Sequence, residues 1–225
     1  MVEVTINDTT YKMPEVMAID TWSAILKWDF EDPKYWPRIV GTAIGCNPLL
    51  LQDADEESLE LAIIFIATSV QKRKEVACKD FNTLTFGEFV DLEVYLTYGL
   101  DKHIKDIIEI LDAECEDVAQ ALWLIDRYVE FRNYTYRQYS TLFGLNGPTD
   151  PDEEAEEVDP MQVAKSWYKI IVGLAGDNIL NIDDVTDQPL KKALNFMALE
   201  KEKQLEEEQR LLKQKRQHDL QTNRR

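Results

Sequence analysis

The chain has 225 residues, 44% of them hydrophobic, so it is long enough to bury a core in one large domain or two small ones. Its formal net charge of −18 at pH 7 argues against binding to nucleic acid or to an anionic membrane, because phosphate groups attract clustered cations. The longest apolar run, Leu61–Ala67, is far shorter than the roughly 20 residues that a membrane-spanning helix needs. The start of the chain lacks the basic and apolar regions of a signal peptide, which favours a protein of the cytoplasm.

The charge is distributed unevenly. Residues 189–225 hold ten Lys and Arg against six Asp and Glu, a net charge of +4, and residues 1–188 hold a net charge of −22. Solubility alone explains an acidic body of this kind, and so does a partner with a basic surface. The composition leaves both explanations open.

Local patterns predict the first elements. Residues Val2–Ile6 and Thr9–Met13 flank Asn7-Asp8, a turn made of residues that tolerate positive φ, and this predicts a β-hairpin. A lone hairpin is marginal in water, so we expect it to pack on helices. The next predicted helices span Ile19–Trp28 and the residues from Asp32-Pro33 to Gly45.

The strongest helix prediction is Glu56–Lys72. Its middle part is apolar almost all round, so we expect it to be the central buried helix of its domain.

The stretch Thr83–Leu111 predicts a short strand or turn, a helix over about Phe86–Tyr98, a break at Gly99, and a second helix from about Asp101.

A further helix is expected over Glu116–Tyr134. Its predicted core face is Val118, Leu122, Ile125 and Val129. The aromatic row that follows it could stack on nucleic-acid bases, but its acidic surroundings favour packing. This row consists of Phe131, Tyr134, Tyr136, Tyr139 and Phe143.

The last third of the chain predicts a linker and two helices. Residues 146–160 contain three prolines, seven acidic residues and no basic residue, a composition typical of a linker. An amphipathic helix is expected over Met161–Leu174, and a long helix from Leu190 toward Asp219. The prediction is therefore a mainly α fold. An N-terminal β-hairpin and helical domain (1–145) is followed by the acidic linker (146–160) and a helical C-terminal region (161–225) ending in a solvated helix.

Residues that carry chemistry are sparse. Cys46, Cys78 and Cys115 form no CxxC pair, which argues against a disulfide framework and a zinc site. The two histidines, His103 and His218, have no Cys or Ser partner nearby in the sequence, and no phosphate-binding glycine motif occurs. We therefore expect no enzyme, no cofactor and no metal. A hydrolase or transferase built from distant carboxylates is the remaining catalytic alternative.

Two stretches resemble small acidic bacteriophage proteins of the tail-assembly-chaperone and baseplate-hub-assembly type. One is TLTFGEFVDLEVYLTYG followed by IKDIIEIL. The other is a Trp167-Tyr168 helix, an acidic turn at Asp183-Asp184, the dipeptide Pro189-Leu190, and a helix over Asn195–Lys201.

This resemblance implies a non-enzymatic role: binding of the tape-measure protein or of baseplate hub components during virion assembly. The alternative is a permanent structural component of the tail or baseplate. It also implies the host cytoplasm as the location, or the virion tail for the alternative, and it leaves self-association open. The candidate partner-binding residues are Trp167, Ile170, Leu194, Phe196, Met197, Leu205 and Leu212.

Overall fold

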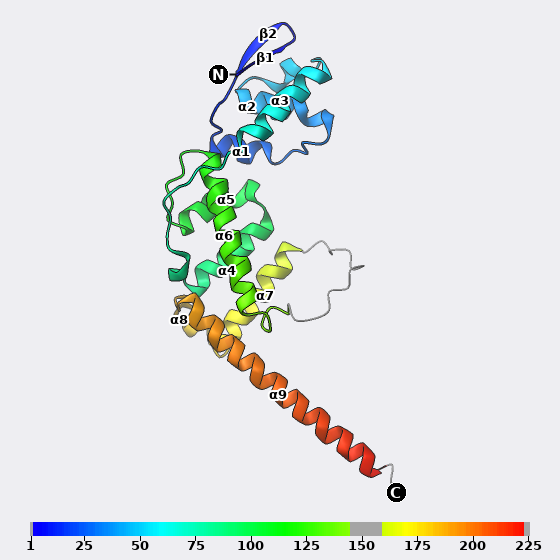
Figure 1. Ribbon diagram of the computed structural model, residues 1–225, viewed down its shortest axis with the longest axis vertical. Helices are drawn as coiled ribbons and strands as arrows, with labels where there is room; N and C mark the ends of the chain where they lie inside the picture. Colours follow the sequence, from blue (N-terminus) through cyan, green and yellow to red (C-terminus); the bar gives the residue numbers. More distant parts are fainter. Residues whose placement is uncertain (1, 145–158, 223–225) are drawn as a thin grey trace. The chain divides into compact units, whose positions relative to one another are not determined.

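The computed structural model describes residues 2–144 and 159–222, and in these residues the protein is mainly α-helical (Figure 1). The predicted fold class is confirmed, including the N-terminal hairpin and the long last helix. The strands and α-helices are β1 Val2–Ile6, β2 Thr9–Met13, α1 Ile19–Ile25, α2 Trp36–Ile44, α3 Glu56–Ser69, α4 Phe86–Tyr98, α5 Leu100–Ile110, α6 Val118–Gln138, α7 Pro160–Leu174, α8 Ile182–Thr186 and α9 Leu190–Thr222. Short 3-10 turns occur at Pro33–Tyr35, Pro48–Leu51, Phe81–Thr83 and Ile179–Asn181.

The chain forms two compact units, and neither is one continuous stretch. The first unit contains Met1–Phe81, Val90–Glu130 and Val158–Trp167, and the second contains Asn82–Phe89, Phe131–Glu157 and Tyr168–Arg225. Most of the predicted linker, residues 145–158, lies outside the described residues, so the predicted division at residues 146–160 stays a prediction.

The hairpin forms with the predicted strands and turn. Ile6 pairs with Thr9, and the two turn residues between them, Asn7 and Asp8, have φ angles of 50° and 58°. Asn and Asp adopt this left-handed conformation more readily than other residues with a side chain, which explains why a two-residue turn forms here. Ile6 and Met13 are buried, because the hairpin packs against α2 and α3 (Figure 1).

The first helix is shorter than predicted. It ends at Ile25, and not at Trp28, and two acidic side chains bind the backbone of the following loop. Asp29 accepts a hydrogen bond from the Glu31 amide at 2.9 Å, and Asp32 accepts one from the Lys34 amide at 3.1 Å.

Helix α3 differs from its prediction in length and in burial. It ends at Ser69 rather than Lys72, and the Thr68 hydroxyl donates back to the Ile64 carbonyl at 2.6 Å in its last turn. The expectation of a central buried helix is wrong. Only one side of α3 packs on the core, while Leu61 and Ile64 on the other side are 58% and 52% exposed.

The stretch from residue 81 to residue 111 confirms the predicted helix, break and second helix. Thr85 makes an isolated β-bridge, α4 ends at Tyr98, and α5 begins at Leu100, one residue earlier than predicted.

Helix α6 begins at Val118 and runs to Gln138. Its predicted core face is shifted by about one residue. Leu122 and Val129 are half-buried, and the buried residues of its first three turns are Val118, Gln120, Ala121, Leu124, Ile125 and Tyr128.

Gly99 separates α4 from α5 and permits one testable prediction. Its φ is 103°, and a Cβ placed there would lie 2.7 Å from Oδ1 of Asp101. We expect Gly99→Ala to destabilise the protein by roughly 1–3 kcal/mol, because alanine is strained at this φ. Urea denaturation measures the loss. Gly173→Ala, within helix α7 and with no atom near the added Cβ, is the control and should not destabilise.

Candidate functional site

The second unit holds the base of α9 by backbone pairing. The Leu190 amide donates to the Leu84 carbonyl at 2.9 Å, and the Phe86 amide donates to the Gln188 carbonyl at 2.8 Å. The bridge pairs Thr85 with Pro189, which has no N–H of its own to donate. Two segments about a hundred residues apart in the sequence thus fix where α9 begins.

Close packing and a capping box reinforce this junction. A Cβ on Gly87 would lie 2.9 Å from Cβ of Thr186, so only glycine allows α4 to approach α8 this closely. Thr85 and Glu88 cap the start of α4 reciprocally. The Thr85 amide donates to the Glu88 carboxylate at 2.8 Å, and the Glu88 amide donates to the Thr85 hydroxyl at 3.2 Å.

The aromatic row after α6 packs within the second unit. Phe89 and Phe143 both contact the ring of Tyr136, with ring centroids 6.4 and 4.1 Å away. The Tyr139 hydroxyl donates to Oδ1 of Asn195 on α9 at 2.8 Å. These contacts agree with the packing interpretation of the row, although Tyr134 remains 60% exposed.

The first two turns of α9 bury one side of the helix. The buried residues are Leu190, Ala193, Leu194 and Met197. At about 100° per residue, Leu205 and Leu212 lie on the continuation of this same side, two and four turns further along. We call the row of Leu190, Leu194, Met197, Leu205 and Leu212 the α9 seam.

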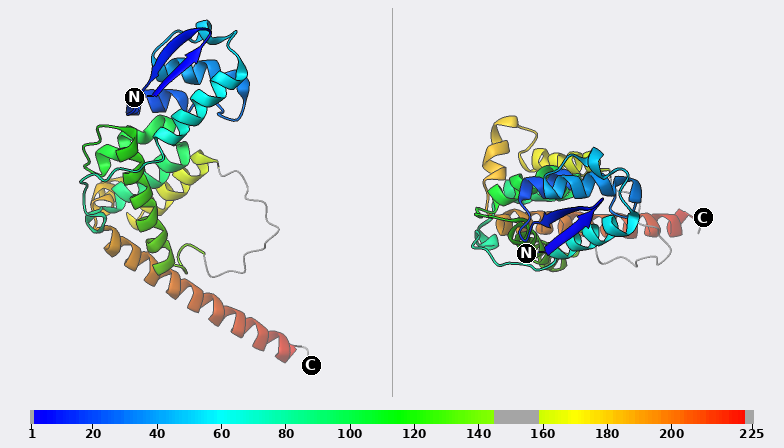
Figure 2. Two further views of the ribbon diagram at one scale, coloured as in Figure 1. Left: turned by 45° about the horizontal axis from the view of Figure 1, so that its top comes forward. Right: turned by 90° about the horizontal axis from the view of Figure 1, so that it is seen from above.

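From Lys201 to Arg216 the helix is exposed on all sides, apart from the half-buried Leu205. Leu212 is 54% exposed. Figure 2 shows α9 continuing through this part as one uninterrupted helix. The ion pairs of Glu200 with Lys203, at 2.6 Å, and of Glu207 with Arg210, at 3.7 Å, lie within the helix itself. The seam is thus covered at its start and uncovered at its end.

The seven predicted partner-binding residues fall into three groups. Trp167, Leu194 and Met197 are buried, and Trp167 belongs to the first unit. Ile170 and Leu205 are half-buried. Phe196 and Leu212 are exposed. A partner could reach the last group directly, whereas the three buried side chains already pack inside the chain.

A cavity of about 570 Å³ lies beside the buried half of α9. Its lining combines apolar and polar side chains: Leu174, Asn181, Asp184, Val185, Gln188, Lys192, Ala193 and Phe196. The polar ones are largely bound to their neighbours. Lys192 donates to the Gln188 side chain at 2.6 Å, and Gln188 donates to the Asp184 carbonyl at 2.7 Å. The free part of the lining is therefore mostly apolar.

Sequence reasoning missed most of this lining, although it did identify Phe196. Ile179 and Leu180, next to Asn181 in the chain, were missed too, and they are 76% and 82% exposed. They sit in a 3-10 turn, which is too short to produce a hydrophobic period that could be read from the sequence. The only available signal was an apolar pair inside a polar turn.

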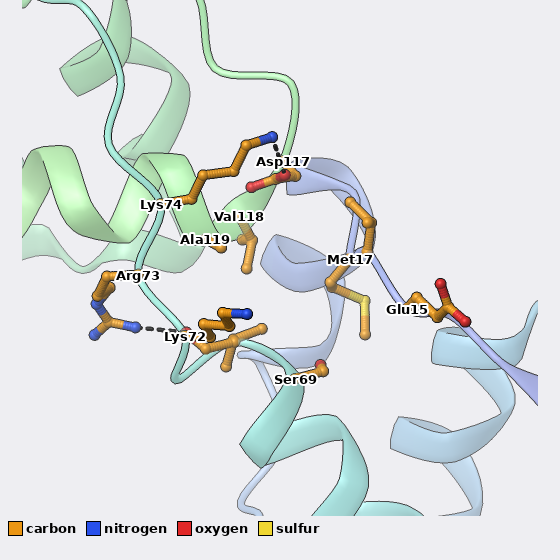
Figure 3. A pocket seen from close by; sticks show the side chains of 11 residues that line it. Glu15, Met17, Ser69, Lys72, Arg73, Lys74, Asp117, Val118 and Ala119 are labelled. Atoms are coloured by element: carbon orange, nitrogen blue, oxygen red, sulfur yellow. Dashed lines mark hydrogen bonds and ion pairs between the residues drawn. The ribbon is translucent and has the colours of Figure 1, made fainter. Parts of the chain in front are cut away.

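The first unit has a separate cavity of about 390 Å³ (Figure 3). Figure 3 shows Lys74 reaching Asp117, and their ion pair is 3.5 Å long. Asp117 also accepts a hydrogen bond from the Gln120 amide at 2.9 Å, as the N-cap of α6. Met17, Val70 and Val118 supply apolar lining. The Asp117 carboxylate is thus held by its capping role and its ion pair, and Glu15 is the other acidic residue in the lining.

Of the side chains that the structure describes, His103 and the three cysteines could act as bases or nucleophiles. His103 stacks on Tyr95, with ring centroids 4.6 Å apart, and its Nδ1 lies 2.7 Å from a carboxylate oxygen of Asp106. Burial raises the pKa of the Cys46, Cys78 and Cys115 thiols, so neutral pH favours their unreactive protonated form. Within residues 2–144 and 159–222, no three His, Cys, Asp or Glu side chains gather in a way that could hold a metal ion.

Comparison with protein-family models, with curated proteins and with solved structures gave no match. None of the helices in the described part of the chain is both long and apolar enough to cross a membrane.

Proposed function

We propose that this protein is a non-enzymatic chaperone of bacteriophage tail or baseplate assembly, which binds a helical segment of the tape-measure protein or of a hub component. The observation that carries this proposal is the α9 seam, which is buried from Leu190 to Met197 and then continues uncovered to Leu212. The sequence resemblance to tail-assembly chaperones supports the choice of client.

A partner helix would use the uncovered seam as helix-binding proteins commonly do. Leu205 and Leu212 are seven residues apart, two turns of the helix, which is the spacing at which a second helix places its own apolar anchors. Covering the seam would remove apolar surface of both helices from water, which stabilises the complex. Phe196 and the neighbouring cavity form a separate surface, because nine residues place Phe196 on the side of α9 opposite Leu205.

Co-expression with the tape-measure protein of the same phage tests the proposal. We expect a soluble complex that co-purifies through an affinity tag on this chain, and we expect the tape-measure protein to aggregate when expressed alone. A chain shortened after Ala198 is the matched control, because it keeps the buried part of the seam and lacks the uncovered part. Failure of the full chain to co-purify with tape-measure or hub proteins would contradict the proposal.

The alternative is a permanent structural component of the tail or baseplate. The same uncovered helix favours it, because a long exposed helix can also be an assembly contact in a finished particle. Mass spectrometry of purified virions separates the two functions. A chaperone should be absent or far below stoichiometric amounts, whereas a structural component should be present in a fixed ratio to other tail proteins.

A further inference from the structure

The far part of α9 carries its charges in a fixed order along the chain. From Glu200 to Glu208 there are five acidic residues and two lysines, and from Gln209 to Arg216 there are four cations and no acid. All of the residues from 201 to 216 are exposed apart from the half-buried Leu205. A helix with an acidic first half and a basic second half is complementary in charge to a second copy of itself that runs the opposite way.

The charges on the side away from the α9 seam already pair within the helix. Glu200 binds Lys203 at 2.6 Å, and Glu207 binds Arg210 at 3.7 Å. At about 100° per residue, all four lie roughly 140° or more around the helix from Leu205. These four charges are therefore engaged, and they point away from any helix that covers the seam.

Four other charged side chains flank the seam. Glu206 and Lys213 lie along one of its edges, and Glu208 and Lys215 lie along the other. All four are exposed, and within the described residues none of them has a hydrogen bond or an ion pair. On each edge the acid precedes the base by seven residues, which is two turns of the helix.

We propose that this part of α9 pairs with the same part of a second copy of the chain, with the two helices antiparallel. A two-fold axis level with the peptide bond between residues 210 and 211 places Leu212 opposite Gln209 of the second copy, and Leu205 opposite Arg216. The leucines then pack on the methylene groups of these long side chains, whose polar ends still reach water.

The same register pairs the charges on both edges. A two-fold axis brings each edge of the seam against the same edge of the second copy, in the reverse direction. Glu206 then faces Lys213 of the second copy, and Glu208 faces Lys215, each with a shift of about 3 Å along the helix. Symmetry repeats both pairs, so the dimer gains four ion pairs between the helices, of the kind that sets partner choice in paired helices.

The seam itself selects the antiparallel orientation. In a parallel pair each residue would lie opposite its own copy, so Glu202 would face Glu202, and Arg216 would face Arg216, beside the leucines. Like charges placed against each other across an interface are unfavourable. Antiparallel pairing avoids both contacts, and it also sets the two helix dipoles in opposite directions.

The charge order selects a second copy as the occupant. A partner helix must offer a base and an acid seven residues apart on both edges in reverse order, and α9 itself meets this requirement. Two leucines from each helix bury little apolar surface, so the dimer is weak and depends on concentration. The dimer does not need the proposed function. Competition between a client and the second copy for Leu205 and Leu212 is the one consequence that rests on it.

Sedimentation velocity of the full chain without a client, over a concentration series in about 0.15 M salt, tests the pairing. We expect the unaltered chain to pass from monomer to dimer as its concentration rises. Lys215→Glu should weaken dimerisation about tenfold, because it turns two attractive pairs into repulsive ones. Adding Glu208→Lys to this variant should restore the dimer, since the two pairs form again with their signs exchanged.

Lys201→Glu is the matched control. It makes the same charge change on the same edge of the helix, fourteen residues earlier, where the antiparallel register places it opposite the uncharged residues 220–222 of the second copy. It should therefore leave the dimer in place. In a parallel pair Lys201 would face Glu206, so the same variant also reports the orientation. Circular dichroism of each variant confirms that the helix content is kept.

Three results would each overturn the inference. These are a chain that stays monomeric at the highest concentration, a dimer that Lys215→Glu and Lys201→Glu weaken equally, and a dimer that the added Glu208→Lys fails to restore. Co-expression with the tape-measure protein tests the proposed function separately. A client that co-purifies with a chain that never dimerises contradicts the pairing alone, and a dimer that binds no client contradicts the proposed function alone.

Discussion

Leu194→Ala is expected to lower the free energy of unfolding by about 2–5 kcal/mol, the usual cost of removing a fully buried leucine side chain. Leu194 is 0% exposed. The next residue, Asn195, accepts a hydrogen bond from the Tyr139 hydroxyl through its side chain. The cavity left by the truncation cannot close easily, because the backbone bridge at Pro189 fixes the base of α9. Urea denaturation followed by circular dichroism measures the change.

Leu212→Ala is the matched control, because it removes the same atoms from the same helix. Leu212 is 54% exposed, so its loss should change stability by no more than about 0.5 kcal/mol. Equal effects of the two substitutions would contradict the division of the α9 seam into a buried half and an uncovered half.

Local sequence signals predicted the elements whose geometry is decided locally. The hairpin followed from Asn7-Asp8, because those residues adopt the backbone angles that the turn requires. The break between α4 and α5 followed from Gly99 for the same reason. In both cases the residue type decides the backbone conformation, so neither prediction needed knowledge of the tertiary structure.

The surroundings of α3 could not be predicted in this way. An apolar run such as Leu59–Val70 has no polar side, so its sequence does not show which side packs and which remains exposed. The exposure of Leu61 and Ile64 depends on how many neighbours the rest of the chain supplies. The sequence therefore predicted the helix but gave the wrong burial for it.

The candidate site was predicted only in part for a similar reason. The sequence predicted Leu194, Met197, Leu205 and Leu212 as partner-binding candidates. It could not reveal where the body that covers this side ends, because that depends on the pairing of Thr85 with Pro189. Such pairing between distant segments leaves no local pattern in the sequence.

Replacing both Leu205 and Leu212 with serine is expected to weaken binding of the helical client at least about tenfold. The two leucines are the apolar side chains of the uncovered seam, and Leu211 is the one other apolar residue between Lys201 and Arg216. Folding should change little, because neither leucine is buried. Biolayer interferometry with the co-purified tape-measure or hub protein as the probe measures the affinity.

Leu199→Ser provides the control for Leu212→Ser measured alone, since Leu199 is 50% exposed and lies on the side of α9 opposite Leu190. Leu199→Ser and Leu212→Ser each remove one exposed leucine from α9 and lower its helix propensity equally. A general loss of helix or of apolar surface would therefore weaken binding in both, whereas a helix seated on the seam is sensitive only to Leu205 and Leu212. Equal binding by the two variants would rule out the seam as the contact, and with it the role of α9 as the docking arm.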